Sequence, residues 1–537
     1  MEYLILSELT LPRLLWRALL GRPTSIVAVR SLFGGPTGRL DRIAGWLESK
    51  GRVSRLLDQR SDLAPFADYG DLMRLADPFV EAEPWINDFF DFEESDGRFG
   101  RYGIAYRHAV CNAVFQRFSA AFLINGIGEA TPEPGTRVSG LDEIDLAYFR
   151  NRFGDGAPLS LIKTLHLHWV LNLFRFAAVV VYSTLWIMSR VRLAPPLPES
   201  IFLGSDFVGS GHDRILWDEI ADADHQVLVV TRNRAMASEY ADMLEGYRHV
   251  NVTDGWFSLF QAAAAFWEIL MDGIRLFRLG SALPGDFYHR FAVLPHRRAV
   301  IKALFNRFRF KNFWGRDDYN TDHIIRSQEL RKTGGVSLGV MHGIPCICKV
   351  AHQFRHLDYD IYYMLGREQY DNFYRHTWPA HTRVKAIGSF GASRSELERL
   401  KEPRPKNIAC FLSPSFHQVK VMEALETLTR AFPDRKVFIN VKSPKYLTGA
   451  FAEALEDLMD RGPDNLVIDN RRAYELLFQC NYVVNESSTL TAEAIQFGLY
   501  GFALDLGDRA KSHYYRRFPD ICLSSGEEAV ERIRDID

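Results

Sequence analysis

The sequence predicts an α/β protein with two Rossmann-like domains that face a cleft, and with a helical accessory region in its N-terminal half. Three observations support this fold class. Short apolar runs alternate with segments of helical length after residue 406, a similar series begins near residue 200, and 537 residues suffice for two or three domains. Strands that alternate with helices in this way form parallel sheets covered on both faces.

The first half of the chain is predicted to contain two regions. Residues 1–36 read as strand, helix and strand, which is the first β-α-β unit of the N-terminal domain. Residues 37–200 are helical and aromatic in pattern, with loops that bear proline and glycine, and predict the accessory region.

The second half predicts the two Rossmann-like domains. Residues 201–400 form the N-terminal one, which opens with a strand, a glycine-bearing loop, a helix and a further strand. Residues 401–537 form the C-terminal one, in which helices separate five expected strands at 408–415, 436–443, 465–470, 482–488 and 501–507.

Composition narrows the classes of function. The formal net charge of −2 offers no global field for nucleic acid, so we expect no nucleic-acid partner. Six cysteines are too few for a disulfide scaffold in a chain of this length, and the first 21 residues lack a basic segment followed by a cleavage site. We therefore expect a cytoplasmic protein, with peripheral contact at the inner membrane left open.

Two segments raise that question of membrane contact. Residues 165–189 carry one full charge, Arg175, but the uncharged run after it is shorter than the roughly 20 residues of a spanning helix. A buried helix and an in-plane or hairpin membrane contact both stay open. Residues 289–316 combine basic and aromatic side chains without an acidic one. This suits an anionic membrane surface, a local nucleic-acid contact, or a solvated helical face above an aromatic core.

Three adjacent hydroxyls follow the expected strand at 482–488. In parallel sheets, ligands bind beyond the carboxyl ends of the strands, where helix N-termini present N–H groups to anions. Ser487, Ser488 and Thr489 therefore form a candidate phosphate cradle, and Glu493, one turn later, can reach a ribose hydroxyl. The alternative is ordinary N-capping by serine or threonine.

A second constellation ends the strand that precedes His342 and Gly343. The glycine permits a sharp turn and close approach of a ligand, and the histidine is a candidate general base or phosphate contact. Asp206 and His212 flank another glycine-bearing loop that follows a strand. Cys346 and Cys348 lack the second ligand pair of ordinary structural zinc sites, so no metal site is predicted.

The segments "VMHGIP", "YDIYYMLG", "VFINVKSP" and "NESSTLTAEAIQFG" resemble, in order, elements of bacterial surface-polysaccharide glycosyltransferases of the GT-B type. This group includes capsular Kdo transferases, bacterial sialyltransferases and CDP-glycerol glycerophosphotransferases. The resemblance covers about a third of the chain, residues 334–507. One element departs from the pattern, because Ser443 stands where the family often has histidine.

The resemblance implies a role for each candidate residue. The C-terminal domain would bind a nucleotide-activated donor, with its phosphate at Ser487, Ser488, Thr489 and Lys442 and its nucleoside at Glu493 and Pro444. The N-terminal domain would bind a glycan or lipid-linked acceptor near Gly343 and His212, with His342 as base and Asp206 as the alternative base.

The predicted function is a metal-independent, inverting transfer of a sugar from a CMP- or CDP-linked donor to a surface polysaccharide or glycolipid, without a further cofactor. The alternatives are a nucleotide-sugar epimerase of the same two-domain form and a noncatalytic member that binds glycan or membrane.

Overall fold

A computed structural model describes most of the chain. The described residues are 2–29, 38–55, 103–114, 136–153, 160–163, 168–209, 212–222, 225–316, 320–343, 354–389, 391–400, 402–412, 418–441, 449–461, 464–469, 471–486, 488–506 and 514–537.

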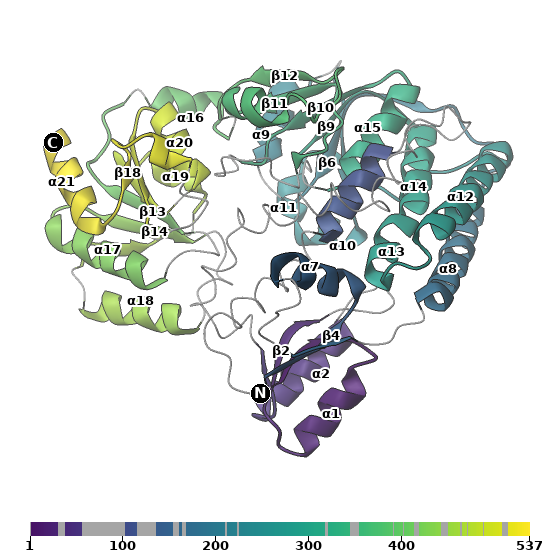
Figure 1. Cartoon of the computed structure of the whole chain (residues 1–537). Coiled ribbons are helices and arrows are strands. Elements are labelled where there is room, and N and C mark those ends of the chain that lie inside the picture. Colours follow the sequence, from purple (N-terminus) through teal and green to yellow (C-terminus); the bar gives the residue numbers. More distant parts are fainter. Residues whose placement is uncertain are drawn as a thin grey trace.

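Three parallel sheets organise the described part of the chain (Figure 1). They have five, seven and six strands and follow one another along the sequence. The last two, with helices packed around them, confirm the predicted class of an α/β protein with two Rossmann-like domains. We call the seven-stranded sheet and its helices the central domain, and the six-stranded sheet and its helices the C-terminal domain.

The five-stranded sheet corrects the prediction for the first 200 residues. Its order is β3-β2-β1-β4-β5, so the β-α-β unit of residues 1–36 belongs to a sheet of its own and not to the central domain. Residues 37–200, predicted to be helical, supply three of its strands. Its elements are β1 (Glu2–Leu6), α1 (Leu11–Leu19), β2 (Thr24–Val29), α2 (Gly38–Ser49), β3 (Ser54–Arg55), β4 (Arg137–Leu141), α7 (Glu143–Phe153) and β5 (Ser160–Lys163).

The central domain begins after the long helix α8 (His168–Ser189) and has the strand order β12-β11-β10-β9-β6-β7-β8. Its strands are β6 (Glu199–Phe207), β7 (Val227–Thr231), β8 (Arg248–Asn251), β9 (Phe308–Gly315), β10 (Val336–Val340), β11 (Ile361–Met364) and β12 (Arg383–Ala386). Its helices are α9 (His212–Ile220), α10 (Arg234–Glu239), α11 (Ala241–Leu244), α12 (Leu259–Gly280), α13 (Gly285–Ala292), α14 (Leu294–Arg307), α15 (Asp322–Lys332) and the π-helix η3 (Tyr370–Tyr374).

The C-terminal domain has the strand order β15-β14-β13-β16-β17-β18, which is the 3-2-1-4-5-6 order typical of dinucleotide-binding domains. Its strands are β13 (Ile408–Leu412), β14 (Val437–Val441), β15 (Leu466–Ile468), β16 (Tyr482–Asn485), β17 (Tyr500–Leu504) and β18 (Cys522–Leu523). The order reverses between β13 and β16, so a ligand is expected beyond the carboxyl ends of these two strands.

Helices cover both faces of that sheet. They are α16 (Arg394–Arg399), α17 (Gln418–Ala431), α18 (Gly449–Arg461), α19 (Ala473–Leu477), α20 (Thr489–Gln496), the 3₁₀ helix η6 (Tyr515–Arg517) and α21 (Gly526–Ile536). One apolar cluster joins α17, α18 and α21 to one face, and another joins α19 and α20 to the opposite face. The six strands include the five predicted from the sequence.

The basic and aromatic segment 289–316 lies inside the central domain. It forms parts of α13 and α14 and the middle strand β9. Its aromatic side chains are buried, with exposed fractions of 5% or less, at Phe305, Phe308, Phe310, Phe313 and Trp314. A membrane contact through these aromatic residues is therefore wrong, because the sheet already surrounds them. The alternative of an aromatic core beneath a solvated face describes the segment.

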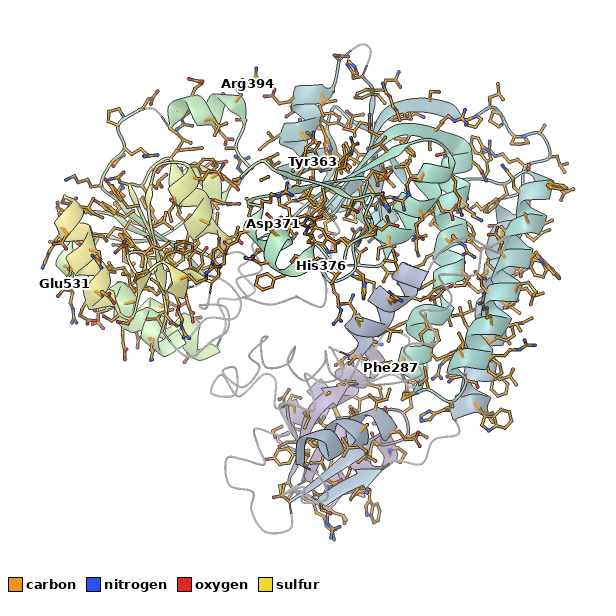
Figure 2. All side chains as sticks on the ribbon, turned by 45° about the horizontal axis from the view of Figure 1, so that its top comes forward. Phe287, Tyr363, Asp371, His376, Arg394 and Glu531 are labelled. Atoms are coloured by element: carbon orange, nitrogen blue, oxygen red, sulfur yellow. The ribbon has the colours of Figure 1, made fainter. Side chains whose placement is uncertain are left out.

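The chain crosses from the central to the C-terminal domain within a very short segment. The N–H of Ile387 donates to the carbonyl of Met364 in the central sheet, at 2.9 Å. Two residues later the N–H of Ser389 donates to the Gln496 side chain of α20, at 2.7 Å. Figure 2 labels Tyr363, on β11 of the central sheet, and Arg394, at the start of α16 beyond the crossing.

Candidate active site

The two motifs singled out in the sequence meet at the boundary between the domains. Gly343 follows β10 at the carboxyl edge of the central sheet, and Thr489 begins α20 at the carboxyl edge of the C-terminal sheet. A Cβ atom on Gly343 would lie 3.0 Å from the Thr489 hydroxyl oxygen. His342, next to this contact, is exposed. The glycine thus allows the two carboxyl edges to approach each other closely.

The hydroxyl-rich turn is both a helix cap and part of this contact. The Ser488 hydroxyl caps α20 by accepting a hydrogen bond from the N–H of Leu490 at 3.2 Å, and the Tyr515 hydroxyl donates to the Ser488 carbonyl at 2.5 Å. Capping therefore accounts for Ser488, whereas Thr489 faces the central domain. Ser487, Lys442 and Pro444 lie outside the described residues.

Asn485 holds this turn at the point where the strand order reverses. Its side-chain oxygen accepts from the N–H of Phe411 in β13 at 2.7 Å, and its amide group donates to the hydroxyl of Thr491 in α20 at 3.2 Å. Asn485 is 1% exposed. A buried amide with both ends engaged fixes the start of α20 against β13, so the N-terminus of this helix has a defined position.

Glu493 lies one turn along α20 and is partly buried. Its carboxylate accepts a hydrogen bond from the Tyr474 hydroxyl at 2.8 Å, and that hydroxyl also lies 2.9 Å from the Ser389 hydroxyl. Burial raises the pKa of Glu493, although hydrogen bonds from Tyr474 and Ser389 and the charge of Arg316 act in the opposite direction. The carboxylate is thus held by Tyr474 of the C-terminal domain and Ser389 of the crossing, and it feels the charge of Arg316 from the central domain.

Arg316 and Tyr474 are site residues that the sequence analysis missed. Arg316 directly follows β9 and is 7% exposed, and its charge acts on both Glu493 and Tyr474 of the C-terminal domain. Its place one residue beyond a strand at a carboxyl edge was the signal in the sequence. Reading residues 289–316 as one surface segment concealed it.

The two other predicted residues of the central domain lie elsewhere. Asp206, near the end of β6, is 4% exposed and accepts a hydrogen bond from Arg232 at 2.6 Å, and Arg326 lies 3.6 Å away. Asp206 belongs to β6 and His342 follows β10. Strand β9 lies between these two strands in the sheet, so the two residues are at the ends of strands that are not neighbours. His212 begins α9, and its side chain is outside the described part of the structure.

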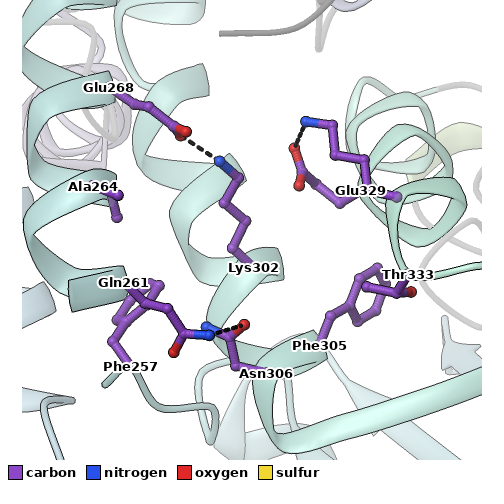
Figure 3. Close-up of a pocket in the computed structure, with 11 residues that line it drawn as sticks. Phe257, Gln261, Ala264, Glu268, Lys302, Phe305, Asn306, Glu329 and Thr333 are labelled. Carbon is purple, nitrogen blue, oxygen red and sulfur yellow. Dashed lines mark hydrogen bonds and ion pairs between the residues drawn. The ribbon is translucent and has the colours of Figure 1, made fainter. Parts of the chain in front are cut away.

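A cavity of about 210 Å³ lies in the helical layer of the central domain, away from the carboxyl edges (Figure 3). It is bounded by α12, α14 and α15 and contains two ion pairs, Glu268 with Lys302 and Glu329 with Lys332 at 3.0 Å. Because these charges already neutralise one another, we place the candidate site at the domain boundary. Among the described residues, no group of three or more His, Cys, Asp or Glu side chains could hold a metal ion.

No family model matches the chain, and no curated protein sequence matches it. Solved structures do. A UDP-GlcNAc 2-epimerase from Neisseria meningitidis bound to UDP-GlcNAc matches 63% of this chain and 91% of its own, with 10% identity and a TM-score of 0.41. MurG from Acinetobacter baumannii matches 63% and 90%, with 10% identity and a TM-score of 0.34. An O-GlcNAc transferase variant from Thermobaculum terrenum matches 88% and 89%, with 10% identity and a TM-score of 0.31. We assign no activity from similarities of this level.

Proposed function

We propose that the protein is a glycosyltransferase that moves a sugar from a nucleotide-activated donor to the hydroxyl of a surface polysaccharide or glycolipid. The observation that supports this most is the contact between Gly343 and Thr489. It brings the carboxyl edges of two Rossmann-like sheets together, and in such sheets nucleotide ligands and catalytic groups are expected at that edge.

The donor binds on the C-terminal side. The N-terminus of α20 and the Thr489 hydroxyl hold the donor phosphates, because free N–H groups and the helix dipole favour an anion there. Arg316 supplies a positive charge from the facing edge. Glu493 accepts a hydrogen bond from a ribose hydroxyl, in the manner of the acidic residue of dinucleotide-binding domains.

The acceptor binds on the central side, next to His342. This histidine takes the proton from the acceptor hydroxyl as the acceptor oxygen bonds to the anomeric carbon of the sugar. The bond from that carbon to the phosphate oxygen breaks, and the nucleotide leaves with the electron pair. Positive groups around the phosphate stabilise the negative charge that develops on it, so the reaction needs no metal ion. Because the transfer is a single displacement, the configuration at the anomeric carbon is inverted.

His342 is preferred to Asp206 as the base. The Asp206 carboxylate is held by Arg232 and lies close to Arg326, so its oxygens are already engaged with positive charges. His342 is exposed and adjoins the contact between the domains. We assign to Asp206 the positioning of these arginines.

The resemblance to capsular Kdo transferases and their relatives favours a CMP- or CDP-linked donor. The test begins with the melting temperature of the full chain in the presence of CMP, CDP, UDP, GDP or dTDP. A nucleotide at about 100 times its dissociation constant should add about 2.7 kcal/mol to the free energy of unfolding.

The corresponding nucleotide sugars are then incubated with glycan and lipid-linked acceptors. We expect transfer by the wild type, and loss of transfer with retained nucleotide binding for His342→Ala. Epimerised donor without an acceptor would instead identify an epimerase. Absence of nucleotide binding throughout the panel would reject the proposal in favour of a noncatalytic protein.

A further inference from the structure

Helix α8 has its polar residues inside and its apolar residues outside. Asn172, Arg175 and Ser183 are buried, and the Asn172 amide donates to the carbonyls of Ser281 and Leu283, each at 2.8 Å. The helix exposes large apolar side chains at Trp169, Phe174, Val181, Tyr182, Leu185 and Met188. Four of them, Phe174, Val181, Leu185 and Met188, share the face opposite Asn172. A helix on a water-exposed surface normally has the reverse arrangement.

Helix α12 extends this apolar face. It packs lengthwise against α8 at the edge of the central domain, far from the C-terminal domain (Figure 1). Gly273 makes the close packing possible, because a Cβ atom there would lie 2.7 Å from the ring of Phe176. Phe260 and Trp267 of α12 are 88% and 51% exposed. Contiguous exposed apolar surface on two helices marks an interaction site.

The charges of these two helices are sorted by sign. Helix α8 has no acidic residue, and α12 has two, Glu268 and Asp272. Both face inward, where Glu268 pairs with Lys302 (Figure 3) and Asp272 with Arg298. The exposed charges of α12 are therefore the basic residues of its last two turns.

Basic residues lie at both ends of the face. Arg275 and Arg278 are exposed near the end of α12, and Arg192 is exposed just after α8. The two helices run in opposite directions, since Asn172 near the start of α8 contacts the end of α12 and Arg192 donates to Phe257 just before α12 begins. The apolar face thus has arginines at each end.

We propose that the α8–α12 face docks on an anionic phospholipid bilayer, with both helices lying in the plane of the membrane. Apolar and aromatic side chains enter the boundary between headgroups and acyl chains, and the arginines contact anionic headgroups. Within the described part of the chain, α8 is the one helix long and apolar enough to cross a bilayer. It lies in plane because Asn172 anchors its inner face to the central domain, where Arg175 is also buried.

The charge pattern favours a bilayer over a second copy of the chain. In a symmetric dimer through this face, each exposed arginine would meet an apolar surface or another arginine, since neither helix exposes an acidic residue. An anionic bilayer satisfies the apolar face and the arginines together. This partner is independent of the proposed sugar transfer.

The test is co-sedimentation of the full chain with vesicles of phosphatidylcholine alone or with a quarter of phosphatidylglycerol. We expect binding to the anionic vesicles, weakened roughly a hundredfold by Phe174→Glu with Leu185→Glu. Both side chains are about two-thirds exposed, so the melting temperature should not change. Leu397→Glu with Met459→Glu, at exposed positions of the C-terminal domain, is the matched control and should bind like the wild type.

A second variant separates the electrostatic contribution. Arg275→Glu with Arg278→Glu should lose most of the preference for anionic vesicles, because each basic residue near such a surface contributes about fivefold in affinity. Equal binding by the wild type and the Phe174–Leu185 variant would overturn the proposal. So would a wild type that ignores vesicles and forms a dimer that this variant dissociates.

Discussion

Thr489 and Thr491 offer a matched pair of substitutions on one short helix. Thr489 faces Gly343 across the domain boundary, whereas Thr491 is buried and bonded to Asn485. Replacing Thr489 by valine keeps the shape and removes one hydrogen bond to a charged phosphate, which costs about 2 kcal/mol of binding energy. The dissociation constant then rises about 30-fold. At a nucleotide concentration that stabilises the wild type by about 2.7 kcal/mol, the variant gains about 0.9 kcal/mol.

The assay is the nucleotide-dependent shift in melting temperature, measured with the nucleotide that stabilises the wild type. The shift of each variant is measured against the same variant without nucleotide. Thr491→Val should lose about 1 kcal/mol of stability, because the buried Asn485 amide loses a partner, but should keep most of the nucleotide shift. A full shift in Thr489→Val, or a shift lost in Thr491→Val alone, would refute the placement of the phosphate.

Two further substitutions test charges held inside the protein. Glu493→Gln should raise the melting temperature at neutral pH. Burial raises the pKa of Glu493, so the folded wild type loses stability as the pH rises through that pKa and the carboxyl group ionises, whereas glutamine stays neutral. Calorimetry from pH 4 to 8 should show that the stability gained by the variant grows with pH, and the variant should bind nucleotide more weakly than the wild type. Asp358→Asn should cost about 3 kcal/mol in urea unfolding, because Asp358 is 1% exposed and accepts from Arg331 and His381. Burial opposes ionisation of Asp358, but those bonds lower its pKa. The difference in free energy of unfolding between the variant and the wild type should therefore be full above pH 3.8 and shrink as the pH falls below it. A difference that does not change with pH would contradict this reasoning.

The C-terminal domain could be predicted from the sequence because its strands are short and apolar and its helices follow at regular spacing. Strand β4 shows why the N-terminal region could not. Its five residues include a glycine with a positive φ of 88° and follow a segment rich in proline and glycine, which is a loop pattern. Pairing with β1 and β5 makes this segment a strand, in which Val138 and Leu141 are buried.

The sequence predicted the two halves of the candidate site, each at the carboxyl edge of a sheet, but it did not predict that the two halves lie together. The rule that ligands bind at strand carboxyl ends selected both Gly343 and Thr489. Their proximity depends on how two domains pack, which no local pattern encodes. Tyr474 is a further example, because a tyrosine in an amphipathic helix reads as an ordinary core residue until Glu493 and Ser389 lie beside it.

Gly388 is the one residue between the last hydrogen bond to the central sheet and the first to α20. Its φ of 74° suits glycine, and a Cβ atom there would collide with the Gln496 side chain. Any swivel of one domain against the other must therefore turn on the backbone of this residue. Widening the boundary must also separate Glu368 from Arg517, which form an ion pair across it. We therefore expect substitution at position 388 to alter how the central and C-terminal domains are held against each other.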